Sequence, residues 1–172
     1  MNPLAPALLA FFALIVIIAA VKDLSSYIIP NWVSAALAAV FVPSALLLHA
    51  PLPLIGQSLL VGVAMLALGI VMFALKWMGG GDAKLMAAAA PWIGLAGLPR
   101  FVLFTALAGG ILGMALIAAR SVWLRPFTIA GPAWARRLAT PGAEAPYGVA
   151  IAAGALAAFP SGLIMHLAHL AA

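Results

Sequence analysis

Six long apolar runs, joined by short connections, take up most of this 172-residue chain. They lie at about residues 4–21, 33–50, 54–75, 85–98, 101–119 and 147–170. A helix that spans a bilayer needs about 20 consecutive apolar residues, and most of the runs approach that length. The sequence therefore predicts an all-α, polytopic membrane protein: a bundle of about six transmembrane helices in a single membrane-embedded domain that covers residues 1–172.

The composition excludes several other classes of protein. Hydrophobic residues make up 67% of the chain and charged residues only 6%, whereas soluble domains carry roughly a quarter charged residues. Cysteine is absent, which excludes disulfides, thiolate nucleophiles and cysteine-based zinc sites. His166 and His169 lie three residues apart, but no carboxylate or cysteine accompanies them, so we interpret them, with His49, as interfacial or terminal residues. We therefore expect neither a metal nor a cofactor.

The basic residues predict the orientation of the chain in the membrane. The net charge is +5, but the eight Lys and Arg residues are scattered between apolar runs and form no patch for nucleic acid. Lys and Arg favour cytoplasmic connections. Only Arg100 falls in the second or fourth connection, whereas the first, third and fifth hold Lys22, Lys76, Lys84, Arg120, Arg125, Arg136 and Arg137. This asymmetry places the odd connections, including a long loop at about 120–146, in the cytoplasm and both termini outside.

The three acidic residues, Asp23, Asp82 and Glu144, all fall in connections predicted to be cytoplasmic. Asp23 follows the first apolar run, and Asp82 follows the glycine run 79–81. Taken alone, either aspartate could be a solvated loop residue, and Asp82 could simply cap the next helix. Ionisable residues at membrane segments are costly, however, and often functional. The glycines also permit positive φ and the close approach of another chain.

Two carboxyl groups held together can hydrolyse a peptide bond without a metal. One must be ionised to take a proton from water, and the other must be protonated to polarise the scissile carbonyl. Adjacent like charges disfavour double ionisation, which keeps the two groups in these different states. A helix N-terminus favours an ionised carboxylate and a helix C-terminus disfavours it. On this interpretation Asp82 is the ionised partner and Asp23 the protonated one.

The segment around Asp82 resembles a known family. Gly79-x-Gly81-Asp82 is similar to the Gly-x-Gly-Asp signature of membrane aspartyl proteases. Lys84 and Leu85 continue it in the form found in the type IV prepilin peptidase family.

Two further segments carry the same resemblance. Asp23, followed by Pro30 and Asn31, is similar to the first aspartate of that family and its Ile-Pro-Asn segment. The segment Pro146-Tyr147-Gly148 is similar to the one that opens the family's last helix. The resemblance thus extends along essentially the whole chain.

The resemblance implies an aspartyl endopeptidase that removes the leader peptide of type IV prepilins or pseudopilins. It assigns catalysis to Asp23 and Asp82, an active-site loop to Gly79, Gly81 and Lys84, and positioning of the substrate to the other matched residues. It also implies a multi-pass protein of the bacterial inner membrane, in contact with lipid, whose active site faces the cytoplasm. Bifunctional members carry an added cytoplasmic segment, commonly with cysteine motifs, that methylates the product. This chain has none and resembles the short, methylase-less type of tight-adherence (Flp) pili.

Two alternatives remain open at the level of sequence. A presenilin-like intramembrane protease shares Gly-x-Gly-Asp, but its Pro-Ala-Leu motif follows the second aspartate, whereas Pro6-Ala7-Leu8 here precedes the first. A small transporter, or a membrane subunit of a secretion apparatus, would place ionisable groups along a path near the bilayer midplane. The apolar runs at about 33–50, 101–119 and 147–170 contain no acid.

Overall fold

The computed structural model describes residues 4–121, 130, 136 and 145–170, and the elements in this part of the chain are helical. The all-α fold predicted from the sequence is therefore confirmed. Most of the loop predicted at about 120–146, including Glu144, lies outside the described residues. The elements are α1 (Ala5–Ser26), α2 (Asn31–Leu47), α3 (Leu52–Ala74), α4 (Gly80–Arg120), α7 (Tyr147–Ala158), the 3-10 turn η1 (Phe159–Ser161) and α8 (Leu163–Leu170).

The described helices have the length and surface of a membrane protein. Four segments are long and apolar enough to cross a bilayer: α1, α3, α4 and the stretch Tyr147–Leu170, whereas α2 has only 17 residues. The predicted number of about six spanning helices is not confirmed by this criterion. Large apolar side chains such as Leu60, Ile111 and Ile117 are exposed, which suits contact with lipid tails. The chain is a membrane protein.

The predicted boundary between the fourth and fifth helices is wrong. Two helices were expected at about 85–98 and 101–119, but Pro99 and Arg100 are helical, and the interruption is at Gly94 (φ 70°, ψ 178°). Glycine reaches this conformation without the steric penalty that a Cβ would bring. Pro99 is the fifth residue of the limb that begins at Leu95, so it removes one hydrogen bond to the first turn without ending the helix.

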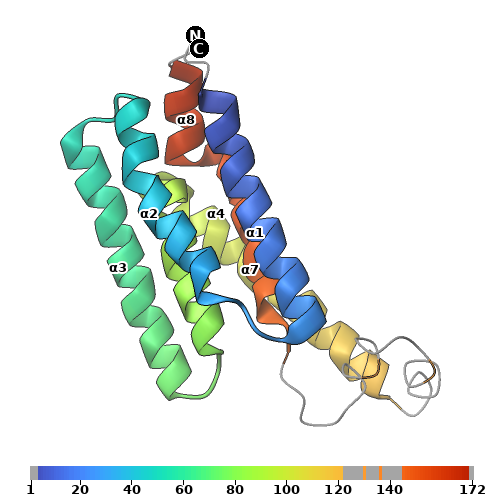
Figure 1. The fold of residues 1–172 in the computed structure, drawn as a ribbon. Helices are drawn as coiled ribbons and strands as arrows, with labels where there is room; N and C mark the ends of the chain where they lie inside the picture. Colours follow the sequence, from blue (N-terminus) through green and yellow to red (C-terminus); the bar gives the residue numbers. More distant parts are fainter. Residues whose placement is uncertain (1–3, 122–129, 131–135, 137–144, 171–172) are drawn as a thin grey trace.

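Gly94 reverses the direction of α4. In Figure 1 the limb before Gly94 (residues 80–93, green) runs upward, and the limb after it (residues 95–120, yellow) runs back down. Both ends of α4 therefore lie at the lower end of the bundle, where α1 and α3 end and where α2 and α7 begin. Residues far apart in the sequence are brought together there.

An aromatic cluster holds the helices in this arrangement. Trp92 is fully buried, packs against the rings of Phe12 and Phe41, and donates a hydrogen bond of 2.9 Å from Nε1 to the carbonyl of Leu37 on α2. Phe12 on α1 also stacks on Phe159 of η1, with ring centroids 4.3 Å apart. Each such ring pair contributes about 0.5–1.5 kcal/mol beyond its buried area. The cluster fixes α1, α2, α4 and the last helical segment relative to one another.

Candidate active site

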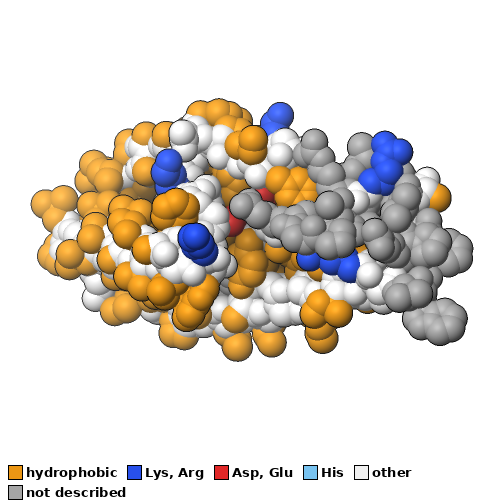
Figure 2. All heavy atoms as spheres, turned by 90° about the horizontal axis from the view of Figure 1, so that it is seen from below, with side chains coloured by type: hydrophobic (Ala, Val, Ile, Leu, Met, Phe, Trp, Pro, Cys, Tyr) orange, Lys and Arg blue, Asp and Glu red, His pale blue; other side chains and the backbone are white. Residues whose placement is uncertain are grey.

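The two described acidic residues lie at the lower end of the bundle. Asp23 and Asp82 are buried, with 5% and 8% of their surface exposed. Figure 2 shows this end: acidic atoms are recessed among hydrophobic side chains, and Lys and Arg side chains are spread around them. Burial of a carboxyl group in apolar surroundings is costly unless hydrogen bonds compensate.

Asp23 is held by the beginning of α7. It lies in the last turn of α1, which continues to Ser26 instead of ending near residue 21 as predicted. The backbone N–H of Gly148 donates a hydrogen bond of 2.6 Å to Oδ2 of Asp23. Gly148 is the second residue of α7, so this N–H has no acceptor within its own helix and carries part of the positive end of the helix dipole. The structure thus brings the predicted Pro146-Tyr147-Gly148 segment directly onto the first aspartate.

Asp82 is the third residue of α4, which begins at Gly80 rather than at the predicted residue 85. Its Oδ2 accepts a hydrogen bond of 3.3 Å from the backbone N–H of Gly79, the N-cap residue. This contact is one half of a capping box. Asp82 therefore stabilises the start of α4 from the third helical position. The sequence had allowed Asp82 to be the N-cap residue, but that residue is Gly79.

The glycines before Asp82 matter for the room that their missing side chains leave, and not for positive φ. Among the described glycines only Gly94 has positive φ, so residues 79–81 do not adopt the positive φ that glycine permits. A Cβ at Gly81 would lie 3.3 Å from Cβ of Ile29, a tight contact, whereas one at Gly80 would meet Phe73 at an ordinary 3.5 Å. The expected close approach of another segment therefore occurs at Gly81.

Ile29 lies between Gly81, which precedes Asp82, and Gly148, which donates to Asp23. It is buried, and its side chain meets Gly81 of α4 on one side and Gly148 of α7 on the other. The sequence included Ile29 only as the first residue of the Ile-Pro-Asn segment and gave it no role of its own. Its neighbour Ile28 is 68% exposed. The packing role of Ile29 follows from tertiary structure.

Lys84 and Asn31 connect two of the predicted motifs. Nζ of Lys84 donates a hydrogen bond of 3.0 Å to Oδ1 of Asn31 at the surface. Asn31 is the first residue of α2, and Pro30 is its N-cap. The Pro-Asn segment and the glycine-aspartate segment are therefore in direct contact, although 53 residues separate the bonded pair.

The remaining predicted residues, Pro146 and Tyr147, precede Gly148 at the start of α7. Pro146 is fully buried, and Tyr147 is partly buried. The ring of Tyr147 packs directly against Gly109 in the second limb of α4, where any side chain would overlap it. The absence of a side chain at Gly109 leaves the space that the ring of Tyr147 fills.

Asp82 borders two hollows at this end. One, of about 750 Å³, is also lined by Phe73, Trp77 and Tyr147. The other, of about 380 Å³, is also lined by Tyr27 and Asn31. In the part of the chain that the structure describes, no cluster of three or more His, Cys, Asp or Glu residues is arranged to hold a metal ion. The chemistry that this arrangement offers is that of two buried carboxyl groups, of which Asp82 borders the hollows.

Comparison with known proteins identifies a related family. A model of the type IV leader peptidase family matches residues 10–114, which is more than half of the chain and includes both Asp23 and Asp82. No curated protein and no solved structure matches the chain. Gly148 lies outside the matched residues.

Proposed function

The chain belongs to the type IV leader peptidase family, and on this premise we propose that it is an aspartyl endopeptidase whose catalytic pair is Asp23 and Asp82. Membership in a peptidase family makes the protein a hydrolase of the leader peptidase type. Its apolar helices make it a membrane protein. The identity of the catalytic residues, the substrate and the orientation are our proposals.

The observation that carries the proposal is the burial of both aspartates at one end of the bundle, each with a hydrogen bond from a backbone N–H at the start of a helix. A buried carboxyl group in a membrane protein is costly and is usually retained for function. Ile29 packs between Gly81, the neighbour of Asp82, and Gly148, whose N–H donates to Asp23, which supports the action of the two aspartates as a pair. A solvated loop aspartate would need neither the burial nor the donors.

We propose a hydrolysis in which the pair shares one proton. The ionised carboxylate takes a proton from water as the water oxygen attacks the scissile carbonyl carbon, and the protonated carboxyl gives its proton to the carbonyl oxygen. Collapse of the intermediate breaks the C–N bond: the amine leaves with a proton from the pair, and one hydroxyl of the intermediate returns a proton to the pair as the new carboxyl group forms. Both aspartates accept a hydrogen bond from a backbone N–H at a helix N-terminus, Asp82 from Gly79 and Asp23 from Gly148. Because the two carboxyl groups have similar donors, helix ends do not distinguish them, and the shared proton is a property of the pair.

We propose that the substrate is the leader of an Flp-type prepilin or pseudopilin. The connection between α1 and α2 comprises only residues 27–30, which leaves no room there for a methylating segment, and the chain has no cysteine. Lys22, Lys76 and Lys84 lie near the ends of α1, α3 and α4 that meet at the site, which favours a cytoplasmic orientation of this end in the bacterial inner membrane. Both termini then lie outside. Anionic lipid is the natural partner of these lysines.

The test is processing of a co-expressed Flp-type prepilin, read as a mobility shift on a gel. Asp23→Asn and Asp82→Asn preserve the shape of each side chain and should each abolish the shift at normal levels of membrane protein. Glu144→Gln removes the third acid and serves as the matched control, with processing retained. Normal processing by either aspartate variant would refute the catalytic pair. Mass spectrometry of the product separates the presenilin-like alternative, because a cut inside the apolar segment of the substrate would contradict leader removal.

A further inference from the structure

A groove of about 460 Å³ lies between α2 and α3, with the first limb of α4 as its floor. In Figure 1, α2 and α3 flank this limb. Each of them packs on α4, but the two hardly contact each other. The space between them is therefore open to whatever surrounds the bundle in the membrane.

Contacts with α4 fix both walls of this groove. On the α2 side, Nε1 of Trp92 donates its 2.9 Å hydrogen bond to the carbonyl of Leu37. On the α3 side, a Cβ at Gly62 would lie only 2.8 Å from Cγ of Pro91, so α3 rests directly on the floor. The groove thus results from the packing of the bundle itself and is formed before anything binds in it.

One end of the groove reaches the second aspartate. Asn31 and Lys84, which are hydrogen-bonded to each other, line this end, and Asn31 also lines the hollow of about 380 Å³ beside Asp82. From Asn31 to Phe41 the groove follows α2 for about 15 Å, or nearly three helical turns. Beyond Ser34, the described residues that line it are apolar or glycine. The groove is therefore polar beside the candidate active site and apolar farther into the bundle.

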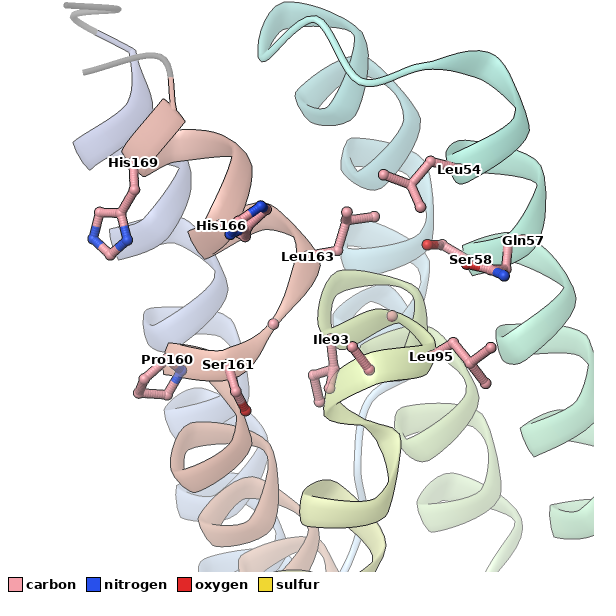
Figure 3. A pocket seen from close by; sticks show the side chains of 13 residues that line it. Leu54, Gln57, Ser58, Ile93, Leu95, Pro160, Ser161, Leu163, His166 and His169 are labelled. Atoms are coloured by element: carbon pink, nitrogen blue, oxygen red, sulfur yellow. The ribbon is translucent and has the colours of Figure 1, made fainter.

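The groove does not continue to the opposite end of the bundle. There α3 lines a different hollow, of about 370 Å³, which Figure 3 shows between Gln57 and Ser58 of α3 and His166 of α8. In the described part of the chain, this hollow shares no lining residue with the groove or with the two hollows beside Asp82. Of the two spaces along α3, only the groove is linked to the candidate active site.

The two walls of the groove suit an apolar helix. On α2 the lining residues beyond Asn31 are small for two turns, and small residues let the backbones of membrane helices approach closely; they are Ser34, Ala35 and Ala38. On α3 the wall consists mainly of large, exposed apolar side chains: Leu59, Val63 and Leu66. A helix can lay one apolar face into such a groove, with contacts at positions i, i+3 or i+4, and i+7. A flexible acyl chain gains nothing from a small-residue wall.

We propose that this groove binds the apolar segment of the substrate as a helix, with the first turn of that segment beside Asn31. The inference rests on the proposed function, in which a peptide bond lies at Asp82 and the part of the substrate after the cut continues into the bilayer. Asn31 is common to the groove and to the hollow beside Asp82. A chain that passes Asn31 therefore enters the groove directly from the candidate active site.

The first test is disulfide crosslinking of the full-length chain in membranes. Ala38→Cys lies in the groove, and Ala39→Cys is an equally exposed neighbour outside it, so it serves as the control. Each is combined with Asp82→Asn to keep the substrate intact and is co-expressed with a prepilin that carries single cysteines along the first three turns of its apolar segment. The disulfide should form from Ala38→Cys at positions with helical spacing, and not from Ala39→Cys.

The second test fills the groove in the active chain. Ala38→Leu adds three carbon atoms to the small-residue wall and should lower the rate of prepilin processing about tenfold at limiting substrate. Ala39→Leu makes the same change outside the groove and should process at the original rate. Rates are compared at equal amounts of membrane-inserted protein, and the crosslink decides if Ala38→Leu is poorly inserted.

The outcomes separate this inference from the proposed function. Cleavage by the original chain with no disulfide from Ala38→Cys, as expected for a groove filled by lipid, would overturn the groove as the binding site. Equal rates for Ala38→Leu and Ala39→Leu would overturn it as well. A disulfide from Ala38→Cys without cleavage by the original chain would refute the catalytic pair and leave the groove supported. Neither cleavage nor a disulfide would overturn both.

Discussion

The backbone N–H of Gly148 lies 2.6 Å from Oδ2 of Asp23, although 125 residues separate them in the sequence. The bond joins the last turn of α1 to the first turn of α7. It therefore fixes the first proposed catalytic residue only when the last helical segment is docked. A donor of this kind to a carboxylate contributes about 1.5–3 kcal/mol.

Gly148→Ala should impair processing severely. The added Cβ would lie 2.8 Å from Oδ2 of Asp23 and 2.7 Å from Cδ1 of Ile29, so the carboxyl group or α7 must move. Loss of the hydrogen bond alone corresponds to about a 10- to 100-fold lower rate. The measurement is the rate of leader cleavage at equal amounts of membrane-inserted protein. Gly110→Ala is the control, because a Cβ there meets nothing within 4 Å; equal rates for the two variants would contradict the role given to Gly148.

Gly81→Ala should reduce processing more than Gly80→Ala. A Cβ at Gly81 is 3.3 Å from Cβ of Ile29, and this neighbour must give by a few tenths of an ångström, whereas the Cβ at Gly80 makes an ordinary contact with the ring of Phe73. Neither position has positive φ, so no backbone strain adds to the effect. We expect a severalfold loss for Gly81→Ala and little change for Gly80→Ala in steady-state cleavage. Similar mild effects at both positions would mean that Ile29 does not set the spacing at Asp82.

Trp92→Phe should destabilise the bundle without removing activity. The change deletes the 2.9 Å hydrogen bond to the carbonyl of Leu37 and leaves space in a fully buried site. The expected loss is about 1–3 kcal/mol in free energy of unfolding, seen as a lower unfolding temperature in detergent. Cleavage at low temperature should persist, because Trp92 touches neither hollow beside Asp82. An unchanged unfolding temperature would show that the aromatic cluster does not hold the helices together.

Single cysteines should label from opposite sides of the membrane. The chain has no native cysteine, so one introduced at exposed Ser25 reports the end with the aspartates and one at exposed Pro51 reports the other end. The Lys and Arg distribution predicts that Ser25→Cys is cytoplasmic and Pro51→Cys external. An impermeant maleimide applied to intact cells should therefore modify only Pro51→Cys. The reverse result would invert the proposed orientation.

Hydropathy alone could predict the helical fold, because the requirement for satisfied backbone groups in lipid leaves a helix as the natural state of each apolar run. It could not predict the ends of the helices. Residues 22–26 are polar or charged in part, yet they continue α1 and carry Asp23 into a buried position. Pro99 and Arg100 suggested an interruption, whereas the chain turns at Gly94, a residue that local sequence does not distinguish from Gly97.

The two aspartates could be singled out because acids are rare in this chain and one follows a glycine run. Their surroundings could not. Three contacts depend on how distant helices pack: that of Gly148 with Asp23, that of Ile29 with Gly81 and Gly148, and that of Gly109 with the ring of Tyr147. These are tertiary relationships, and no local periodicity encodes them.

The shortness of α2 has a consequence for the lipid beside the aspartates. Its 17 residues rise about 25 Å at 1.5 Å per residue, whereas the hydrocarbon core is about 30 Å thick. This hydrophobic mismatch is relieved by local thinning of the bilayer or by sinking of the ends of the helix. Asn31, the first residue of α2, borders the same hollow as Asp82, so thinning at this face brings the water boundary toward the second aspartate. Acyl-chain length should then modulate cleavage, with shorter lipids favouring hydration of the site.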